Sequence, residues 1–159
     1  MSPEVQREVE TTYRRTFNIV VSLGVSILLL LVLNVFLSNR GGPPSNHDFI
    51  SLRISFTMLV VFLAIGSIAL RRVMFHRMRL EIISATGGIK GLLQHLSKTS
   101  VLLAGITEAA AVLGLVFGVL TGDSSSATSM ILAGLAVFLV AFPRRGAWLR
   151  VIASAEATN

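Results

Sequence analysis

Glu108 is the residue of this chain whose type and position most strongly suggest chemistry. It is the one charged residue in the apolar stretch from Ser100 to Thr121. A carboxyl group in apolar surroundings is normally paired, exposed to water or protonated. Two interpretations stay open: a group that carries H⁺ or Na⁺ or contacts a ligand or lipid, and a neutral acid hydrogen-bonded to a neighbouring helix. The candidate partners for the second are polar residues of other apolar stretches: Asn34, Ser55, Thr57 and Ser67.

Other chemistry has little support in the sequence. There is no Cys, which excludes disulfides and Cys-ligated zinc or iron–sulfur clusters. The three His, at positions 47, 76 and 95, lie outside the apolar stretches and have no metal-binding spacing. The chain contains no nucleophile elbow, P-loop or dinucleotide-binding glycine motif, and no nucleophile–base pair for lipid chemistry. We therefore expect a protein that is not an enzyme and has no cofactor or metal.

Four apolar stretches must position these residues, at about 17–37, 54–71, 100–121 and 127–143. The 159 residues are 53% hydrophobic and only 14% charged, too few charges to cover a surface facing water. A helix of about 20 residues crosses the roughly 30 Å hydrocarbon core of a bilayer. Backbone groups inside lipid must pair internally, so we expect helices. The sequence predicts one all-α membrane domain over residues 1–159, a bundle of four transmembrane helices.

The basic residues are distributed unevenly between the connecting segments. Twelve Lys and Arg lie in the N-terminal segment, the second connection and the C-terminal tail, against two, Arg40 and Arg53, in the other connections. The positive-inside rule then places both termini and the connection 72–99 in the cytoplasm, in a bacterial-type inner or plasma membrane with an anionic leaflet as partner. No nucleic-acid partner is expected, because no aromatic stacking pattern accompanies the charges. The predicted membrane-interface anchors are Arg71, Arg72, Arg77, Arg144, Arg145 and Trp148.

The connecting segments carry local signals of their own. Ser2-Pro3-Glu4 predicts the start of a short amphipathic helix, with an apolar face formed by Val5, Val9 and Tyr13. Residues 41–44, Gly-Gly-Pro-Pro, interrupt the first connection. Residues 122–126 are so few that the third and fourth spans must form an antiparallel hairpin.

The second connection is long and basic. Residues 71–83 predict a helical extension of the second span, which the pair Gly87-Gly88 would end. Beyond that pair, one helix face is apolar: Ile89, Leu92, Leu93 and Leu96. This segment either lies on the membrane or forms a stem of the third span; the stem is favoured because no Gly or Pro interrupts residues 92–104.

Small residues at intervals of four form a ridge on the third span: Ala110, Gly114, Gly118 and Gly122. Such a ridge lets a second helix approach closely. Gly114 lies about 240° around the helix from Glu108, so the ridge and the carboxyl group face different directions. The spacing does not say whether the neighbour belongs to the same chain. The pattern favours a small subunit that forms a homo-oligomer or joins a larger membrane complex through this helix.

Residues 92–121, LLQHLSKTSVLLAGITEAAAVLGLVFGVLT, resemble the carboxylate-bearing helix of the proteolipid (c) subunit of rotary ATP synthases. Both run from a polar cytoplasmic loop through small residues to a Glu followed by Ala and an apolar segment. The resemblance implies that Glu108 is an ion-carrying site surrounded by Ala104 and residues 111–114, and hence that the protein translocates H⁺ or Na⁺. It covers about 30 residues; the polar-loop Arg-Gln-Pro is absent, and a fourth span follows.

Overall fold

The computed structural model describes residues 3–39, 49–74 and 77–156, and throughout these residues the regular structure is helical. Five helices follow in order: α1 (Pro3–Ser38), α2 (Ile50–Met74), α3 (Arg77–Thr121), α4 (Ser124–Ala141) and α5 (Arg145–Glu156). The predictions that concern Ser2, Arg40, residues 41–44, His47 and His76 fall outside the described residues. The all-α prediction is confirmed for the described part of the chain.

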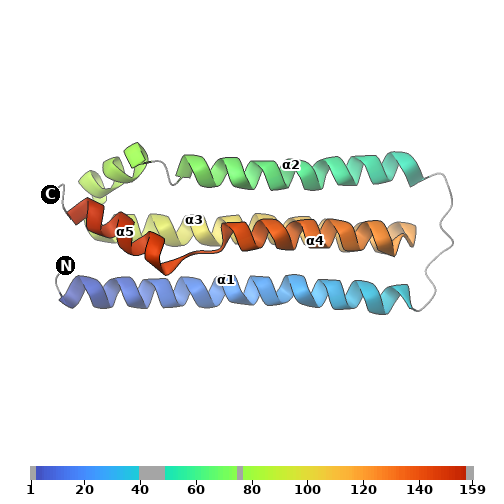
Figure 1. The fold of residues 1–159 in the computed structure, drawn as a ribbon, viewed down its shortest axis with the longest axis horizontal. Coiled ribbons are helices and arrows are strands. Elements are labelled where there is room, and N and C mark those ends of the chain that lie inside the picture. Colours follow the sequence, from blue (N-terminus) through green and yellow to red (C-terminus); the bar gives the residue numbers. More distant parts are fainter. Residues whose placement is uncertain (1–2, 40–48, 75–76, 157–159) are drawn as a thin grey trace.

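The central pair of the bundle is α3 and α4, with α1 on one side and α2 on the other (Figure 1). One apolar cluster joins α1 to the central pair through Val20, Ile27, Ala111 and Ile131, among others. A second joins α2 to the same pair through Val60, Ala110, Phe117 and Met130, among others.

The outer surface of the bundle is strongly apolar. Large side chains such as Phe62, 72% exposed, and Val32, 64% exposed, point away from the helices packed behind them. A protein dissolved in water seldom exposes contiguous apolar patches of this kind. Four segments are long and apolar enough to cross a membrane: 4–38, 50–74, 87–121 and 124–153. The architecture is therefore compatible with a multi-pass membrane protein.

The turn between α3 and α4 contains two residues with distinct tasks. Gly122 has φ 72°, a left-handed conformation that ends α3, and its N–H donates to the Gly118 carbonyl at 2.9 Å. Asp123 then caps α4, because its side-chain oxygen accepts from the Ser126 N–H at 3.0 Å. A connection this short holds α3 and α4 side by side as an antiparallel hairpin, as the sequence predicted.

The second connection differs in part from the prediction. α2 ends at Met74 and a new helix begins at Arg77, so the second span does not extend as one helix to residue 83. Gly88, at φ 58° and ψ −161°, interrupts α3, and the residues before it run at an angle to the rest (Figure 1).

Beyond Gly88, α3 is continuous to Thr121, so residues 89–99 form the stem of the third span. The apolar face of this stem is buried against Val9 of α1 and Trp148 and Ile152 of α5. Protein side chains, rather than a membrane surface, thus cover that face. Because Val9 belongs to the predicted amphipathic segment, the structure also explains that segment: it is the first part of α1 and packs on the stem.

Candidate functional site

The small-residue ridge of α3 packs against other helices of the same chain. A Cβ atom added to Gly114 would lie 3.0 Å from Met130 Cβ and 3.1 Å from the Ala127 carbonyl oxygen, both in α4. One added to Gly118 would lie 2.7 Å from Ala127 Cβ and 2.8 Å from Asn34 Oδ1. These distances are shorter than normal contacts, so the two glycines are needed for α4 and α1 to approach. The neighbour that the sequence left open is α4 of the same chain.

The other two members of the ridge have different surroundings. Ala110 is buried and faces α2, where it joins Val60 and Phe117. Gly122 lies beyond the last residue of α3 and serves the turn. The sequence grouped these four residues by spacing alone, and the structure divides them between two packing faces and a turn.

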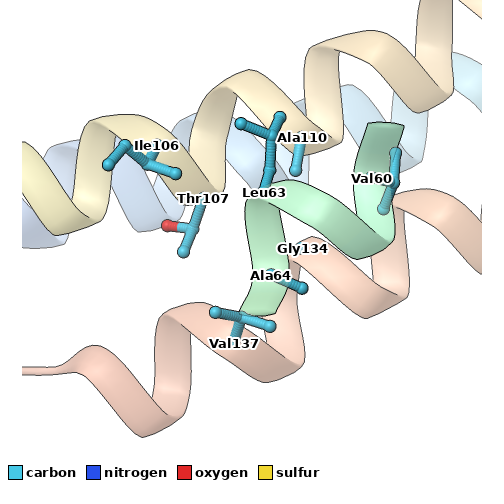
Figure 2. Close-up of a pocket in the computed structure, with 8 residues that line it drawn as sticks. All are labelled: Val60, Leu63, Ala64, Ile106, Thr107, Ala110, Gly134 and Val137. Atoms are coloured by element: carbon cyan, nitrogen blue, oxygen red, sulfur yellow. The ribbon is translucent and has the colours of Figure 1, made fainter. Parts of the chain in front are cut away.

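A shallow groove follows the line where α2 meets α3 and α4 (Figure 2). Its wall is apolar apart from Thr107, whose hydroxyl donates to the Ala104 carbonyl of its own helix at 2.8 Å. The groove leaves no space for a water molecule. It is a packing seam in which Leu63 lies beside the small residue Ala110, and a Cβ added to Gly134 would lie 3.1 Å from the Thr107 carbonyl oxygen of α3 (Figure 2).

Asn34 joins α1 to the start of α4. It is buried, and its Nδ2 donates to Thr128 Oγ1 at 2.9 Å and to the Ser124 carbonyl at 3.3 Å. Thr128 in turn donates to the same carbonyl at 2.7 Å. Hydrogen bonds of this kind between apolar helices contribute about 0.6 kcal/mol each on average. Asn34 is therefore an interhelical hydrogen-bond donor, but it serves α4 and not Glu108.

Glu108 lies at the edge of the α3 surface. Ala104 and Ala111, one turn before and after it, are buried in the cluster with α1 and α4, whereas Val112 is 41% exposed. Glu108 itself is half-buried, and its side chain makes no hydrogen bond or ion pair with another described residue. The ridge glycines face α4 instead, so the carboxyl group and the ridge do point in different directions.

The predicted hydrogen-bond partners of Glu108 are engaged elsewhere. Ser55 donates to the Ser51 carbonyl at 2.9 Å, and Ser67 donates to the Ala64 carbonyl at 2.9 Å, both within α2. Thr57 is exposed on the same helix. Because α2 packs on the side of α3 that carries Ala110, its polar side chains cannot serve Glu108. The prediction that one of these residues pairs with Glu108 within the chain is wrong.

Basic side chains cap two helix ends at the end of the bundle where the chain begins and finishes (Figure 1). Arg71 donates through Nη1 to the Val140 carbonyl in the last turn of α4. His95 Nε2 donates to the carbonyl of Met74, the last residue of α2, at 3.3 Å. The last carbonyls of a helix lack partners within it and carry partial negative charge, so cationic or donor side chains stabilise them. Neither pairing could be predicted from the sequence, because each joins residues distant in the chain.

Among the predicted interface anchors, Trp148 is the clear exception. It is 1% exposed, sits among Val9, Leu92 and Ile152, and has an edge contact with Tyr13 at a ring-centroid distance of 5.4 Å. A side chain so deeply covered is a core residue and does not reach a membrane surface. The stem of α3 explains the difference, since it supplies an apolar partner for α5 at this height.

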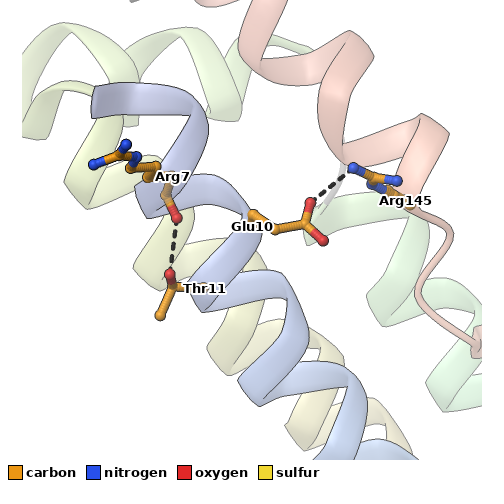
Figure 3. A network of polar contacts seen from close by, with 4 residues as sticks. All are labelled: Arg7, Glu10, Thr11 and Arg145. Atoms are coloured by element: carbon orange, nitrogen blue, oxygen red, sulfur yellow. Dashed lines mark hydrogen bonds and ion pairs between the residues drawn. The ribbon is translucent and has the colours of Figure 1, made fainter. Parts of the chain in front are cut away.

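The predicted anchor arginines differ from Trp148 in their exposure. Arg72, Arg144 and Arg145 are exposed and Arg71 is half-buried, whereas the side chain of Arg77 lies outside the described part of the structure. Arg145 forms an ion pair with Glu10 of α1 at 2.8 Å (Figure 3). Both side chains of this pair are more than half exposed, so it contributes little to stability.

Asp123 lies in the turn between α3 and α4, at the opposite end of the bundle, and its pKa is shifted. The hydrogen bonds from Ser126 lower the pKa of the Asp123 carboxyl below its ordinary value of 3.8, and the charge of Arg53 at the start of α2 contributes in the same direction. Both effects favour the ionised carboxylate. This group stabilises a turn, and its geometry offers no reacting partner.

The described residues contain no group of three or more His, Asp or Glu side chains that could hold a metal ion. Comparison with protein-family models, curated proteins and solved structures gives no match. The molecule is thus a helical bundle with four helices long and apolar enough to cross a membrane. Among the described residues, Glu108 is the one acidic side chain in the middle of an apolar helix, and it lies half-exposed at the edge of α3.

Proposed function

We propose that the protein is a non-enzymatic membrane subunit that docks a second copy of itself, or a larger membrane complex, on the outer face of α3 around Glu108. The observation that carries this proposal is the position of Glu108 beside exposed apolar side chains, without a partner among the described residues. An ionised carboxylate facing lipid costs a few kcal/mol. A neighbouring chain that donates a hydrogen bond to this group removes that cost.

The rest of the outer face of α3 supports the same interpretation. Leu102 before Glu108, and Val112 and Val116 after it, are each 40–47% exposed on the outer side of the helix. The glycine ridge is filled by α4, so a partner helix would meet this side instead. We further propose that both termini and the basic connection lie on the cytoplasmic side of a bacterial-type inner or plasma membrane. The Lys and Arg distribution supports this orientation.

The test is the mass of the species extracted in mild detergent, with variants on and off this face. The wild-type chain, 17.1 kDa, is expected in a species larger than one chain. Val112→Trp should release the single chain because it adds bulk to the face. Leu139→Trp, at a 61% exposed position of α4, should leave the species intact. A wild-type single chain, or a Val112→Trp species of unchanged mass, would contradict the proposal.

Substitutions of Glu108 itself test the hydrogen bond. Glu108→Gln keeps a donor and acceptor of nearly the same shape, so the assembly is expected to persist. Glu108→Leu removes the hydrogen-bonding group and leaves the partner's donor unpaired, which costs about 1–3 kcal/mol. Equal mass distributions for the Gln and Leu variants would exclude a role for this side chain in docking.

A second candidate function, translocation of H⁺ or Na⁺ through Glu108, draws support from Ser26 of α1. α1 and α3 run in the same direction, because Thr16 pairs with Ser97 at 2.7 Å near one end and Asn34 meets Gly118 near the other. Ser26 lies ten residues beyond Thr16 and Glu108 eleven beyond Ser97, both about 15–17 Å along their helices at 1.5 Å per residue. A half-buried hydroxyl thus lies at the height of the carboxyl group.

Transport in proteoliposomes separates the two functions. If Glu108 carries ions, Glu108→Gln abolishes transport while the assembly keeps its mass. Ser26→Ala should then weaken Na⁺ transport more than H⁺ transport, since Na⁺ needs several oxygen ligands and a proton needs one site. Unchanged transport in Glu108→Gln would exclude the carrier function.

A further inference from the structure

A cavity of about 130 Å³ lies at the basic end of the bundle, between the last turns of α2, the stem of α3 and the junction of α4 with α5. Its wall includes the side chains of Arg71, Ser100, Arg144 and Trp148. A water molecule occupies about 30 Å³ of liquid volume, so the cavity has room for about four waters or one small polyatomic ion.

Two of the side chains that line this cavity, Trp148 and Arg71, have donors without an acceptor among the described residues. Trp148 is 1% exposed, and its Nε1 is buried without a hydrogen-bond partner. Buried donors are nearly always paired in proteins, so an orphaned indole N–H beside a cavity calls for an acceptor. Arg71 uses Nη1 for the Val140 carbonyl, which leaves most of its five N–H donors free.

The charged residues described in the wall of the cavity are both basic. The side chain of Arg144 is exposed and makes no hydrogen bond or ion pair with another described residue. None of the described residues that line the cavity is acidic, and Glu10 pairs with Arg145 instead. α5 also begins here, and the partial positive charge of a helix N-terminus favours an anion. Arg71, Arg144, Ser100 and Trp148 therefore line one cavity whose described wall holds no acidic residue.

We propose that this cavity binds a phosphate group. A phosphate presents several acceptor oxygens and one or two negative charges, which match the donors of Arg71, Arg144, Ser100 and Trp148. Arg71 ends the apolar stretch of α2, the height at which lipid headgroups meet a transmembrane helix. The phosphate belongs either to an anionic phospholipid headgroup or to a free phosphate ion. The site is independent of the docking face around Glu108, which lies on another part of α3.

The single tryptophan of the chain gives a direct measurement, because Trp148 lines the cavity and no other indole contributes to the fluorescence. The full-length protein in a neutral detergent is titrated with short-chain phosphatidylglycerol, with phosphatidylcholine and with inorganic phosphate. The site predicts a saturable change in Trp148 emission. Saturation with phosphatidylglycerol alone assigns the headgroup as the source, and saturation with inorganic phosphate assigns the free ion.

Three variants separate a built site from general attraction to a basic surface. Arg144→Gln should weaken the apparent affinity at least tenfold. Ser100→Ala, which leaves the charge unchanged, should weaken it about threefold. Arg150→Gln is the matched control: it removes an equal charge from the neighbouring helix α5, but Arg150 donates to the Gly146 carbonyl of its own helix and does not line the cavity. Its affinity should stay within twofold of wild type.

The proposal is overturned if no titration saturates, or if Arg144→Gln and Arg150→Gln weaken binding equally while Ser100→Ala has no effect. Should Arg144→Gln fail to fold, the Ser100→Ala and Arg150→Gln pair decides the question alone. In that case equal affinities of these two variants and wild type overturn the site.

Discussion

Gly118→Ala is the substitution whose effect the packing of α3 and α4 determines most directly. The new methyl carbon would lie 2.7 Å from Ala127 Cβ, an atom that moves only with its backbone. It would also lie 2.8 Å from Asn34 Oδ1, whose amide holds α1 to α4. Relief of the two contacts requires α4 to move outward or Asn34 to leave its position. Gly105→Ala is the matched control, because a Cβ at Gly105 of the same helix meets no atom within 4 Å.

The expected magnitude follows from two opposing terms. Ala favours a helix over Gly by about 0.8–1.0 kcal/mol, and this term applies to both variants. Overpacking in a close contact costs about 1–3 kcal/mol, and it applies to Gly118→Ala alone. We therefore expect Gly105→Ala to be neutral or slightly stabilising. Gly118→Ala should be less stable than Gly105→Ala by about 1–3 kcal/mol, since the propensity term cancels in the comparison.

The assay is SDS-induced unfolding in a mild detergent, followed by near-ultraviolet circular dichroism, which reports tertiary packing rather than helix content. The free energies of unfolding of the two variants are compared with wild type at equal detergent concentration. If Gly118→Ala proves as stable as Gly105→Ala, the close approach of α3 and α4 at this point is not a constraint, and the reasoning from the ridge fails.

Three further predictions concern the polar contacts. The folded-state pKa of Asp123 lies below its ordinary value of 3.8, so the capping contribution to stability, about 1 kcal/mol, is present above pH 3.8 and is lost as the pH falls through the folded-state pKa. Asp123→Asn also caps the helix but does not titrate. Unfolding curves measured from about pH 6 to pH 3 should therefore show Asp123→Asn to be more stable than wild type only at the acid end. Asn34→Ala removes the bonds to Thr128 and Ser124 and should lower the free energy of unfolding by about 1 kcal/mol, measured as above, whereas no loss would show that these bonds are exchanged for others in the unfolded state. Arg71→Gln, which can still donate to the α4 end but without charge, should cost about 0.3–1 kcal/mol at low salt and less at high salt, and a salt-independent loss would contradict the charge–dipole explanation.

Much of the fold follows from the sequence because lipid-compatible helices have few alternatives. A long apolar stretch whose backbone groups must pair internally is expected to form a helix. The two-residue link at residues 122–123 is too short to let α3 and α4 separate, so the two helices pack together. The stem of residues 89–99 was favoured by the sequence because no Gly or Pro interrupts residues 92–104, although the apolar face alone was equally compatible with a helix on the membrane. The end of α2 at Met74 was not predictable, because the Arg-rich sequence that follows favours a helix and gives no local sign of a boundary there.

The site was less predictable, since it depends on which surfaces meet. The apolar body of Trp148 suits a membrane interface as well as a protein core, and the choice depended on the stem of α3 reaching α5. The cavity beside it joins residues from three helices and has no sequence signature. The position of Glu108 on α3 was readable, but the absence of an intrachain partner among the described residues required knowledge of which side α2 occupies.

The placement of the ridge has a consequence for assembly. A small-residue ridge accepts whichever helix reaches it first, and α4, tethered by two residues, is present at a far higher effective concentration than any separate chain. A second chain can therefore displace α4 only by breaking the closest contacts in the bundle. The outer face of α3 is the surface that remains for a second chain, and its exposed apolar side chains would gain little free energy by exchanging lipid for a protein neighbour. On the docking face proposed above, the Glu108 carboxyl is the group that lipid would leave without a hydrogen bond and a polar partner would satisfy, so the proposal assigns specificity for that partner to this residue.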